Sequence, residues 1–99
     1  MDRTSVLREP VVSAGFNVAS SGTAANSANQ NPGPTCIMVW GTADVYVEVG
    51  EGAVATAGST PIPGGTPFFL PILPGTGAPW RVSVLQISAA GTVYCKAFA

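Results

Sequence analysis

A short valine-rich segment constrains the fold of this chain more than any other feature of the sequence. Between residues 44 and 49, valine occupies every second position, and the positions between hold an aspartate, a tyrosine and a glutamate. This two-residue period predicts a β-strand with one buried face and one wetter face. Residues 36–40, just upstream, are apolar throughout, which predicts a strand covered on both faces. Because only residues 41–43 separate the two segments, we expect a hairpin at the centre of a small β-sheet protein.

Similar short segments recur along the rest of the chain. Six of the nine prolines lie between residues 58 and 79 and exclude a helix there, because proline lacks the amide donor and clashes with the preceding turn. Within this region residues 68–70 are apolar and flanked by prolines, so we expect an edge strand. Residues 80–84 alternate, but the phase changes at Leu85 and Ile87, which indicates either a bulge or a strand covered on both faces. The other expected strands are residues 11–18, 53–57 and 92–98, the last entered through a hairpin turn at residues 88–91.

These segments together define the expected fold class. No segment shows a helical period of adequate length, and turn residues separate the strands about every ten residues. We therefore predict an all-β fold, a small β-sandwich or jelly-roll-like barrel of roughly six to eight short antiparallel strands. Residues 19–34 carry no charge and form a flexible loop or, at residues 24–28, a weak edge strand that pairs locally. Residues 11–99 are the single domain, and residues 1–10 are an extended N-terminal arm or a disordered tail.

The chain is poor in charge. Charged residues make up 9% of the sequence, against about 25% in an average soluble domain. Either the surface is built from uncharged polar residues, or much of it is covered by copies of the chain or by a partner, which we favour. A net charge of −1 leaves no basic field for nucleic acid, and the longest apolar run is too short to span a membrane. The N-terminus lacks the apolar stretch of a secretory signal, so we expect synthesis in a reducing cytoplasm.

The residues that most enzymes and metal sites need are scarce. The sequence has no histidine, so a general base would have to be a carboxylate or Lys96. Asp44 and Glu48 stand four residues apart on the expected strand, which separates them by about 13 Å, too far to act as a pair. We expect both, with Glu51, to be solvated charges; the alternative is a weak calcium site at Glu48 and Glu51. No glycine-rich segment precedes a helix, so we expect neither catalysis, nor a cofactor, nor a metal.

The two cysteines lie in different expected strands. A disulfide between Cys36 and Cys95 would need a suitable separation of their Cα atoms, which a sequence does not supply. In a reducing cytoplasm, two buried thiols are favoured instead.

The sequence leaves two roles for the aromatic side chains. In a chain this small we expect most of them to fill the core. The alternative is a platform on which a carbohydrate or another ligand stacks.

Several motifs in the C-terminal part of the chain carry a family resemblance. They are a valine-rich segment ending in glycine at residues 45–50, a Thr/Ala segment at 55–57, a P-x-P-x-G turn at 61–65 and a strand ending S-A-A-G-T at 88–92. In this pattern the chain resembles small virion proteins of tailed bacteriophages. The resemblance implies an all-β protein of the virion that binds the outer surface of the capsid as a decoration or cement protein. Its partner would be the major capsid protein, and we expect a homo-oligomer, with a trimer preferred over a dimer.

The expected mechanism is bridging of adjacent capsomers. Apolar side chains and strand edges would bind the shell, and many weak contacts would act together across its lattice. The alternatives are a tail or fibre component with a carbohydrate-binding tip, and a head–tail connector component. The expected partner-binding residues lie in the arm and in the proline-flanked strand: Arg3, Val6, Leu7, Arg8, Phe68 and Phe69.

Overall fold

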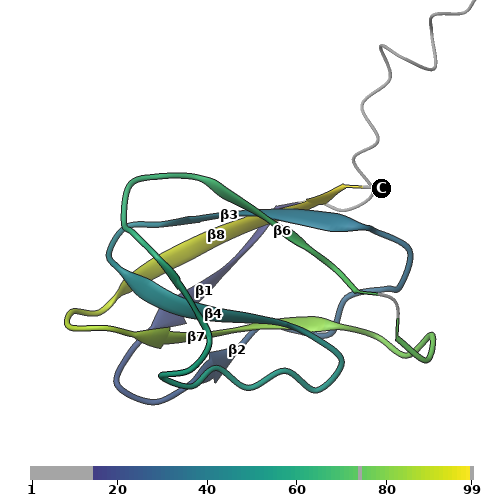
Figure 1. The fold of residues 1–99 in the computed structure, drawn as a ribbon, viewed down its shortest axis with the longest axis horizontal. Helices are drawn as coiled ribbons and strands as arrows, with labels where there is room; N and C mark the ends of the chain where they lie inside the picture. Colours follow the sequence, from purple (N-terminus) through teal and green to yellow (C-terminus); the bar gives the residue numbers. More distant parts are fainter. Residues whose placement is uncertain (1–14, 74, 99) are drawn as a thin grey trace, which may run out of the picture.

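Eight short strands form two antiparallel sheets that stack face to face in the computed structural model, which describes residues 15–73 and 75–98 (Figure 1). No helix occurs in these residues. The prediction of a small all-β sandwich is confirmed, whereas the predicted arm, residues 1–10, lies outside the described part of the chain. Sheet A has the order β1 (Phe16–Ser20), β8 (Gly91–Phe98), β3 (Cys36–Gly41) and β6 (Phe68–Pro71). Sheet B has the order β2 (Ala25–Asn26), β7 (Arg81–Gln86), β4 (Val45–Gly50) and β5 (Thr60–Ile62).

The strands pair in a nested way. β1 pairs with β8, β2 with β7, β3 with β6, and β4 with β5. The chain is thus one long antiparallel ribbon that doubles back between β4 and β5. The ribbon then curls, so that β3 also pairs with β8 and β4 also pairs with β7. This curling closes the two sheets over a shared interior.

Because the pairing is nested, the short connections lie at one end of the sandwich and the long connections lie at the other. Four short connections (residues 21–24, 42–44, 63–67 and 87–90) lie at one end (Figure 1). Hydrogen bonds tie them together: the Gly65 amide donates to the Gly41 carbonyl at 2.7 Å, and the Gly64 amide donates to the Asp44 carboxylate at 2.8 Å. Asp44 therefore fixes a turn. The three longer connections lie at the opposite end, where they line a pocket.

The core is built from the alternate residues that the strands turn inward. Val45 and Val47 are buried, as the two-residue period of that segment predicts. Burying each valine or isoleucine contributes about 1.5–3 kcal/mol relative to leaving it exposed. The main buried residues of the core are Val18, Ile37, Val39, Val45, Val47, Ile62, Ile72, Trp80, Val82, Val84, Val93, Cys95 and Ala97.

The predicted central hairpin is wrong. β3 lies in sheet A and β4 lies in sheet B, so the two strands do not pair with each other. The chain crosses between the sheets within residues 42–44, and Gly41 permits this because an added Cβ would lie 2.9 Å from the Ala43 carbonyl oxygen. The predicted hairpin turn at residues 88–91 is wrong for the same reason, since it joins β7 of sheet B to β8 of sheet A. A two-residue period identifies the buried face of a strand and leaves its neighbours undetermined.

The strand predicted at residues 53–57 is also wrong. β4 pairs instead with β5, which starts at Thr60. Residues 53–57 run along the outer face of sheet B, where the Ala55 amide donates a hydrogen bond of 2.8 Å to the Ser83 hydroxyl. The Arg81 guanidinium donates to the Ala53 carbonyl, also at 2.8 Å. Hydrogen bonds to the side chains of Ser83 and Arg81 thus hold this segment in place of the backbone hydrogen bonds of a β-ladder.

Of the remaining strand predictions, the one at residues 11–18 corresponds to β1, which runs from Phe16 to Ser20, and residues 11–14 lie outside the described part of the chain. The register of β7 runs unbroken from Arg81 to Gln86, and Ser83 is buried beneath the segment just described. The unbroken register excludes a bulge, and the outer face of this strand is covered at Ser83, whereas Ile87 is exposed after the strand ends. β6 is an edge strand, as predicted. The weak strand near residues 24–28 is β2, but it pairs with the distant β7 and not locally.

The buried Ser83 hydroxyl gives a test of this account. Replacing it in Ser83→Ala leaves the Ala55 amide without its partner in a buried place, so we expect the free energy of unfolding in urea to fall by about 1–3 kcal/mol. Ser88→Ala is the matched control, because Ser88 is exposed in the connection between β7 and β8. Equal stability of the two variants would contradict the role assigned to Ser83.

Candidate functional site

The outer face of sheet A carries an unusual concentration of large apolar side chains. Val93, Cys95 and Ala97 of β8 point into the core, so the residues between them point outward. Along β3 and β6, every second side chain likewise points outward on this surface. We call the surface the aromatic face and define it by Met38, Trp40, Phe69, Tyr94, Lys96 and Phe98.

The aromatic rings of this face meet in two pairs. The Trp40 and Tyr94 rings lie on registered neighbours of β3 and β8, with centroids 5.6 Å apart and planes tilted by 37°. The Phe69 and Phe98 rings have centroids 6.2 Å apart. Phe69 is 62% exposed and Tyr94 is 46% exposed, while Trp40 and Phe98 are half-buried. Much of this apolar surface therefore faces outward in the described part of the chain.

The outer face of sheet B differs from that of sheet A. Residues 53–57 lie over it and bury Ser83, with Ala53 and Ala55 themselves buried. Within residues 15–73 and 75–98, no connection is held by hydrogen bonds across the outer face of sheet A in this way. The two outer faces thus differ: residues 53–57 lie over part of one, and the other presents its aromatic side chains.

Lys96 is the one cation of the aromatic face. In the register it stands opposite Met38, and Met38 stands opposite Phe69. Its neighbours along β8 on the same face are Tyr94 and Phe98. Lys96 is exposed, and no carboxylate of the described residues forms an ion pair with it. Apolar side chains therefore border this positive charge along β8 and on the β3 side.

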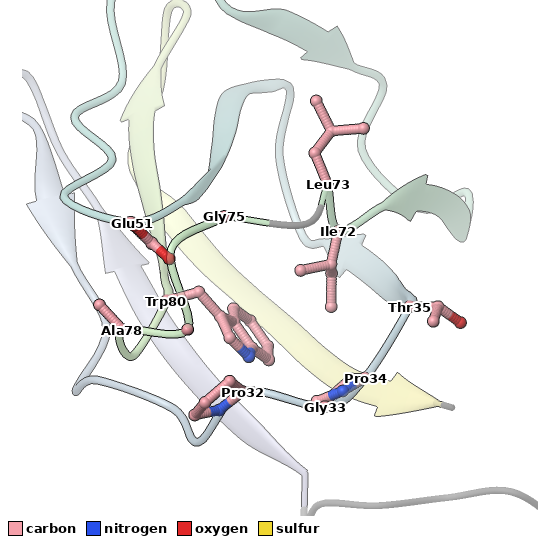
Figure 2. Close-up of a pocket in the computed structure, with 11 residues that line it drawn as sticks. Pro32, Gly33, Pro34, Thr35, Glu51, Ile72, Leu73, Gly75, Ala78 and Trp80 are labelled. Carbon is pink, nitrogen blue, oxygen red and sulfur yellow. The ribbon is translucent and has the colours of Figure 1, made fainter.

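A pocket of about 380 Å³ lies at the end of the sandwich where the long connections gather. Figure 2 shows Trp80 at its floor, with Pro32 and Pro34 on one side and Leu73 on another. Trp80 is buried, packs near the Phe16 ring at 6.4 Å between centroids, and donates its indole N–H to the Asn31 carbonyl at 2.8 Å. The tryptophan is thus committed to the core.

Among the described residues that line this pocket, the one acidic side chain has a structural partner. The Glu51 carboxylate accepts hydrogen bonds from the Thr76 amide at 2.8 Å and from the Thr76 hydroxyl at 3.0 Å. It fastens the connection before β7 to the turn after β4. The carboxylate is exposed and bound to this turn, which differs from the freely solvated charge expected. No group of three or more potential metal ligands occurs in residues 15–73 and 75–98.

The cysteines lie on opposite sides of sheet A. Cys36 stands opposite Phe98 and points outward beside the aromatic face, half-buried. Cys95 stands opposite Val39 and points into the core. Neighbouring strands that turn the two thiols in opposite directions cannot bridge them, and both are free. Burial raises the pKa of the Cys95 thiol to about 12.

The predicted partner-binding residues divide into three groups. Phe69 lies on the aromatic face, whereas Phe68 stands opposite the buried Val39 and so points toward the inner side at the edge of sheet A. The predicted arm residues Arg3, Val6, Leu7 and Arg8 lie outside the described residues. Sequence reasoning did not include Trp40, Tyr94 and Lys96 among the predicted partner-binding residues. The alternation of residues 93–98 was the available signal, since it separates Tyr94, Lys96 and Phe98 from the buried positions.

Comparisons with protein-family models, with curated proteins and with solved structures gave no match to this chain. Among the described residues, no helix is long and apolar enough to cross a membrane.

The thiols give a second test. Because the thiolate is the reactive form, the raised pKa and the burial of Cys95 predict that a disulfide reagent at neutral pH labels Cys36 first. Cys95 should react only as fast as the protein unfolds, and should react rapidly in denaturant. In the Cys36→Ser variant we expect no rapid labelling of the folded protein. Equal labelling rates for the two thiols in the folded protein would contradict the placement of Cys95.

Proposed function

We propose that this chain is a non-enzymatic structural protein of a tailed-bacteriophage virion, which binds the outer surface of the capsid as a decoration or cement protein through its aromatic face. The observation that carries the proposal is the contrast between the two outer faces, one partly covered by residues 53–57 and the other presenting exposed aromatic rings. Contiguous apolar patches of this kind mark interaction surfaces in soluble proteins. Tryptophan and tyrosine are also enriched among the residues that dominate binding energy at interfaces.

The strand pairing agrees with this proposal. The nested order of eight strands in two sheets corresponds to a jelly roll, a fold used by viral capsid and lectin domains. A fold alone does not assign a function, so the main support for the proposal comes from the aromatic face and from the sequence resemblance.

The size of the aromatic face favours a repeated assembly. Three strands spaced about 4.8 Å apart, with about six residues each, give a face of about 300 Å². A standard stable interface buries about 800 Å² on each partner, so one copy alone would bind weakly. We therefore propose a homo-oligomer that places several aromatic faces on adjacent capsomers at once, with a trimer preferred and a dimer second. Linked weak sites of this kind gain affinity without any new contact.

One observation favours a second candidate function. Trp40 and Tyr94 form a tilted aromatic pair, and the register places Asn17 beside Tyr94 on the same face. Aromatic rings flanked by amide groups suit the stacking and hydrogen bonding of a sugar ring. The alternative is therefore a carbohydrate-binding module of a tail or fibre.

The proposal is tested by co-sedimentation of the purified protein with mature empty shells of the parent virus. We expect saturation at a fixed number of copies per shell. The double variant Phe69→Ser/Tyr94→Ser should lose about 2 kcal/mol or more of binding free energy, because both rings would be buried on the shell. Val54→Ser is the matched control, since Val54 is 52% exposed beside sheet B and should bind as the unaltered protein does.

Two results separate the alternatives. Saturable binding to an array of glycans, lost in the same double variant, would favour the carbohydrate-binding module. A weakening of shell binding by Val54→Ser equal to that of the double variant would remove the aromatic face from the proposal. Deleting residues 1–10 tests independently whether the arm contributes.

A further inference from the structure

We propose that the pocket between the long connections binds the N-terminal segment of a second copy of the chain, with Leu7 in the pocket and Arg8 against the Glu51 carboxylate. This contact joins the copies of the homo-oligomer proposed above, and so rests on that part of the proposed function. Three features of the molecule support it: the lining of the pocket, the place where the described chain begins and the charges on the two sides.

The pocket is suited to apolar side chains. Its lining includes Pro34, Ile72 and Trp80, and Figure 2 shows Trp80 at its floor. The indole N–H already binds the Asn31 carbonyl, and the Glu51 carboxylate already accepts two hydrogen bonds. The volume of about 380 Å³ lies near the lower end of the range of ligand sites, which is about 300–1,000 Å³. The pocket therefore suits a few apolar side chains better than a large polar ligand.

The described chain begins beside this pocket. The ring of Phe16, at the start of β1, lies 6.4 Å from the Trp80 ring between centroids. The end of β8, which neighbours β1, reaches the pocket lining where the Thr35 amide donates to the Phe98 carbonyl at 2.8 Å. Residues 1–14 are thus joined to the sandwich at the end that holds the pocket.

The sequence of this segment favours the pocket of another copy over that of the same chain. Pro10 restricts Glu9 to extended backbone, and the β-branched Val11 and Val12 follow it. An extended connection carries Leu7 about 26 Å from the start of the described chain, because each residue spans about 3.3 Å. The pocket of the same chain lies beside that start, so an extended segment passes it and reaches a neighbour.

Charge complementarity supports the same placement. Arg8 follows Leu7 directly, so a Leu7 side chain in the pocket brings the Arg8 guanidinium to the pocket margin. Figure 2 shows the Glu51 carboxylate at this margin. A carboxylate has about four acceptor sites, and Thr76 uses two of those of Glu51, which leaves sites for a guanidinium. A charge-assisted hydrogen bond there would select Leu7 as the residue that enters the pocket.

The contact is compatible with the aromatic face as the docking surface. It uses one end of the sandwich and leaves the outer face of sheet A uncovered. Repeated from copy to copy, a contact between a segment and a pocket closes into a ring when the rotation fits, and a mutual exchange of segments gives a dimer. The trimer and the dimer proposed above can therefore both be built from it.

Paired cysteines test the contact and identify the copies that make it. In a Cys36→Ser background, Leu7→Cys and Ala78→Cys place one thiol on the segment and one on the exposed pocket lining. We expect mild oxidation to join different copies, so that covalent dimers and larger species appear on a gel without reductant. Leu7→Cys with Ala89→Cys is the matched control, since Ala89 is exposed at the opposite end of the sandwich, and should yield monomers.

Point variants of the otherwise unaltered chain measure the two parts of the contact. Leu7→Ser removes the apolar side chain, so we expect the dissociation constant of the homo-oligomer to rise about tenfold or more in sedimentation experiments. Arg8→Glu should have an effect of similar size, because it places a second carboxylate beside Glu51. Arg3→Glu changes the net charge by the same amount and is the matched control, for which we expect association within about threefold of the unaltered protein.

The outcomes distinguish this inference from the proposal on which it rests. A disulfide between positions 7 and 78 within one chain would overturn the inference and assign the pocket to the segment of the same copy. Disulfide formation no faster than in the control, or association unchanged by Leu7→Ser, would overturn it and leave the docking function standing. A monomeric unaltered protein would overturn both the inference and the homo-oligomer. Disulfides between copies of a protein that fails to bind shells would overturn the docking function alone.

Discussion

The sandwich depends on a single layer of apolar side chains shared by its two sheets. In a chain of 99 residues this layer uses the inward-facing residues of the described strands, including Val39 and Val93 from sheet A and Val47 and Val84 from sheet B. One outer face is partly covered by residues 53–57, which form hydrogen bonds with side chains of β7. The other carries the aromatic face, and the functional proposal follows from that difference.

The two ends of the sandwich are held by different means. At one end, short connections form hydrogen bonds with one another, as between Gly65 and Gly41. At the other end, the longer connections are fastened by single side chains: Glu51 holds Thr76, and the Trp80 indole holds Asn31. Among the described residues that line the pocket between these connections, the one carboxylate and the one indole are both engaged in this fastening. The aromatic face is therefore a better candidate for binding the shell than the pocket.

Local sequence patterns predicted well where the strands lie, and predicted poorly which strands pair with one another. The alternation of Val45 and Val47 located a buried face, and the prolines around residues 68–70 located an edge strand. The predicted hairpin between β3 and β4 was wrong. Both strands have an apolar inner face, and such a face is buried equally well whether the two strands pair in one sheet or lie in opposite sheets. The aromatic face itself is formed by strands far apart in the sequence. Only the register that joins β3, β6 and β8 brings Phe69 and Lys96 onto one surface.

Hydroxyl-radical footprinting of the free and the shell-bound protein tests the central claim most directly, because methionine and aromatic side chains react readily and each can be followed by mass spectrometry. If the aromatic face docks on the shell, oxidation of Met38, Phe69 and Tyr94 should fall on binding, while oxidation of Val54 beside sheet B should not change. Protection confined to Val54 and its neighbours, with Met38, Phe69 and Tyr94 as reactive as in the free protein, would contradict the account.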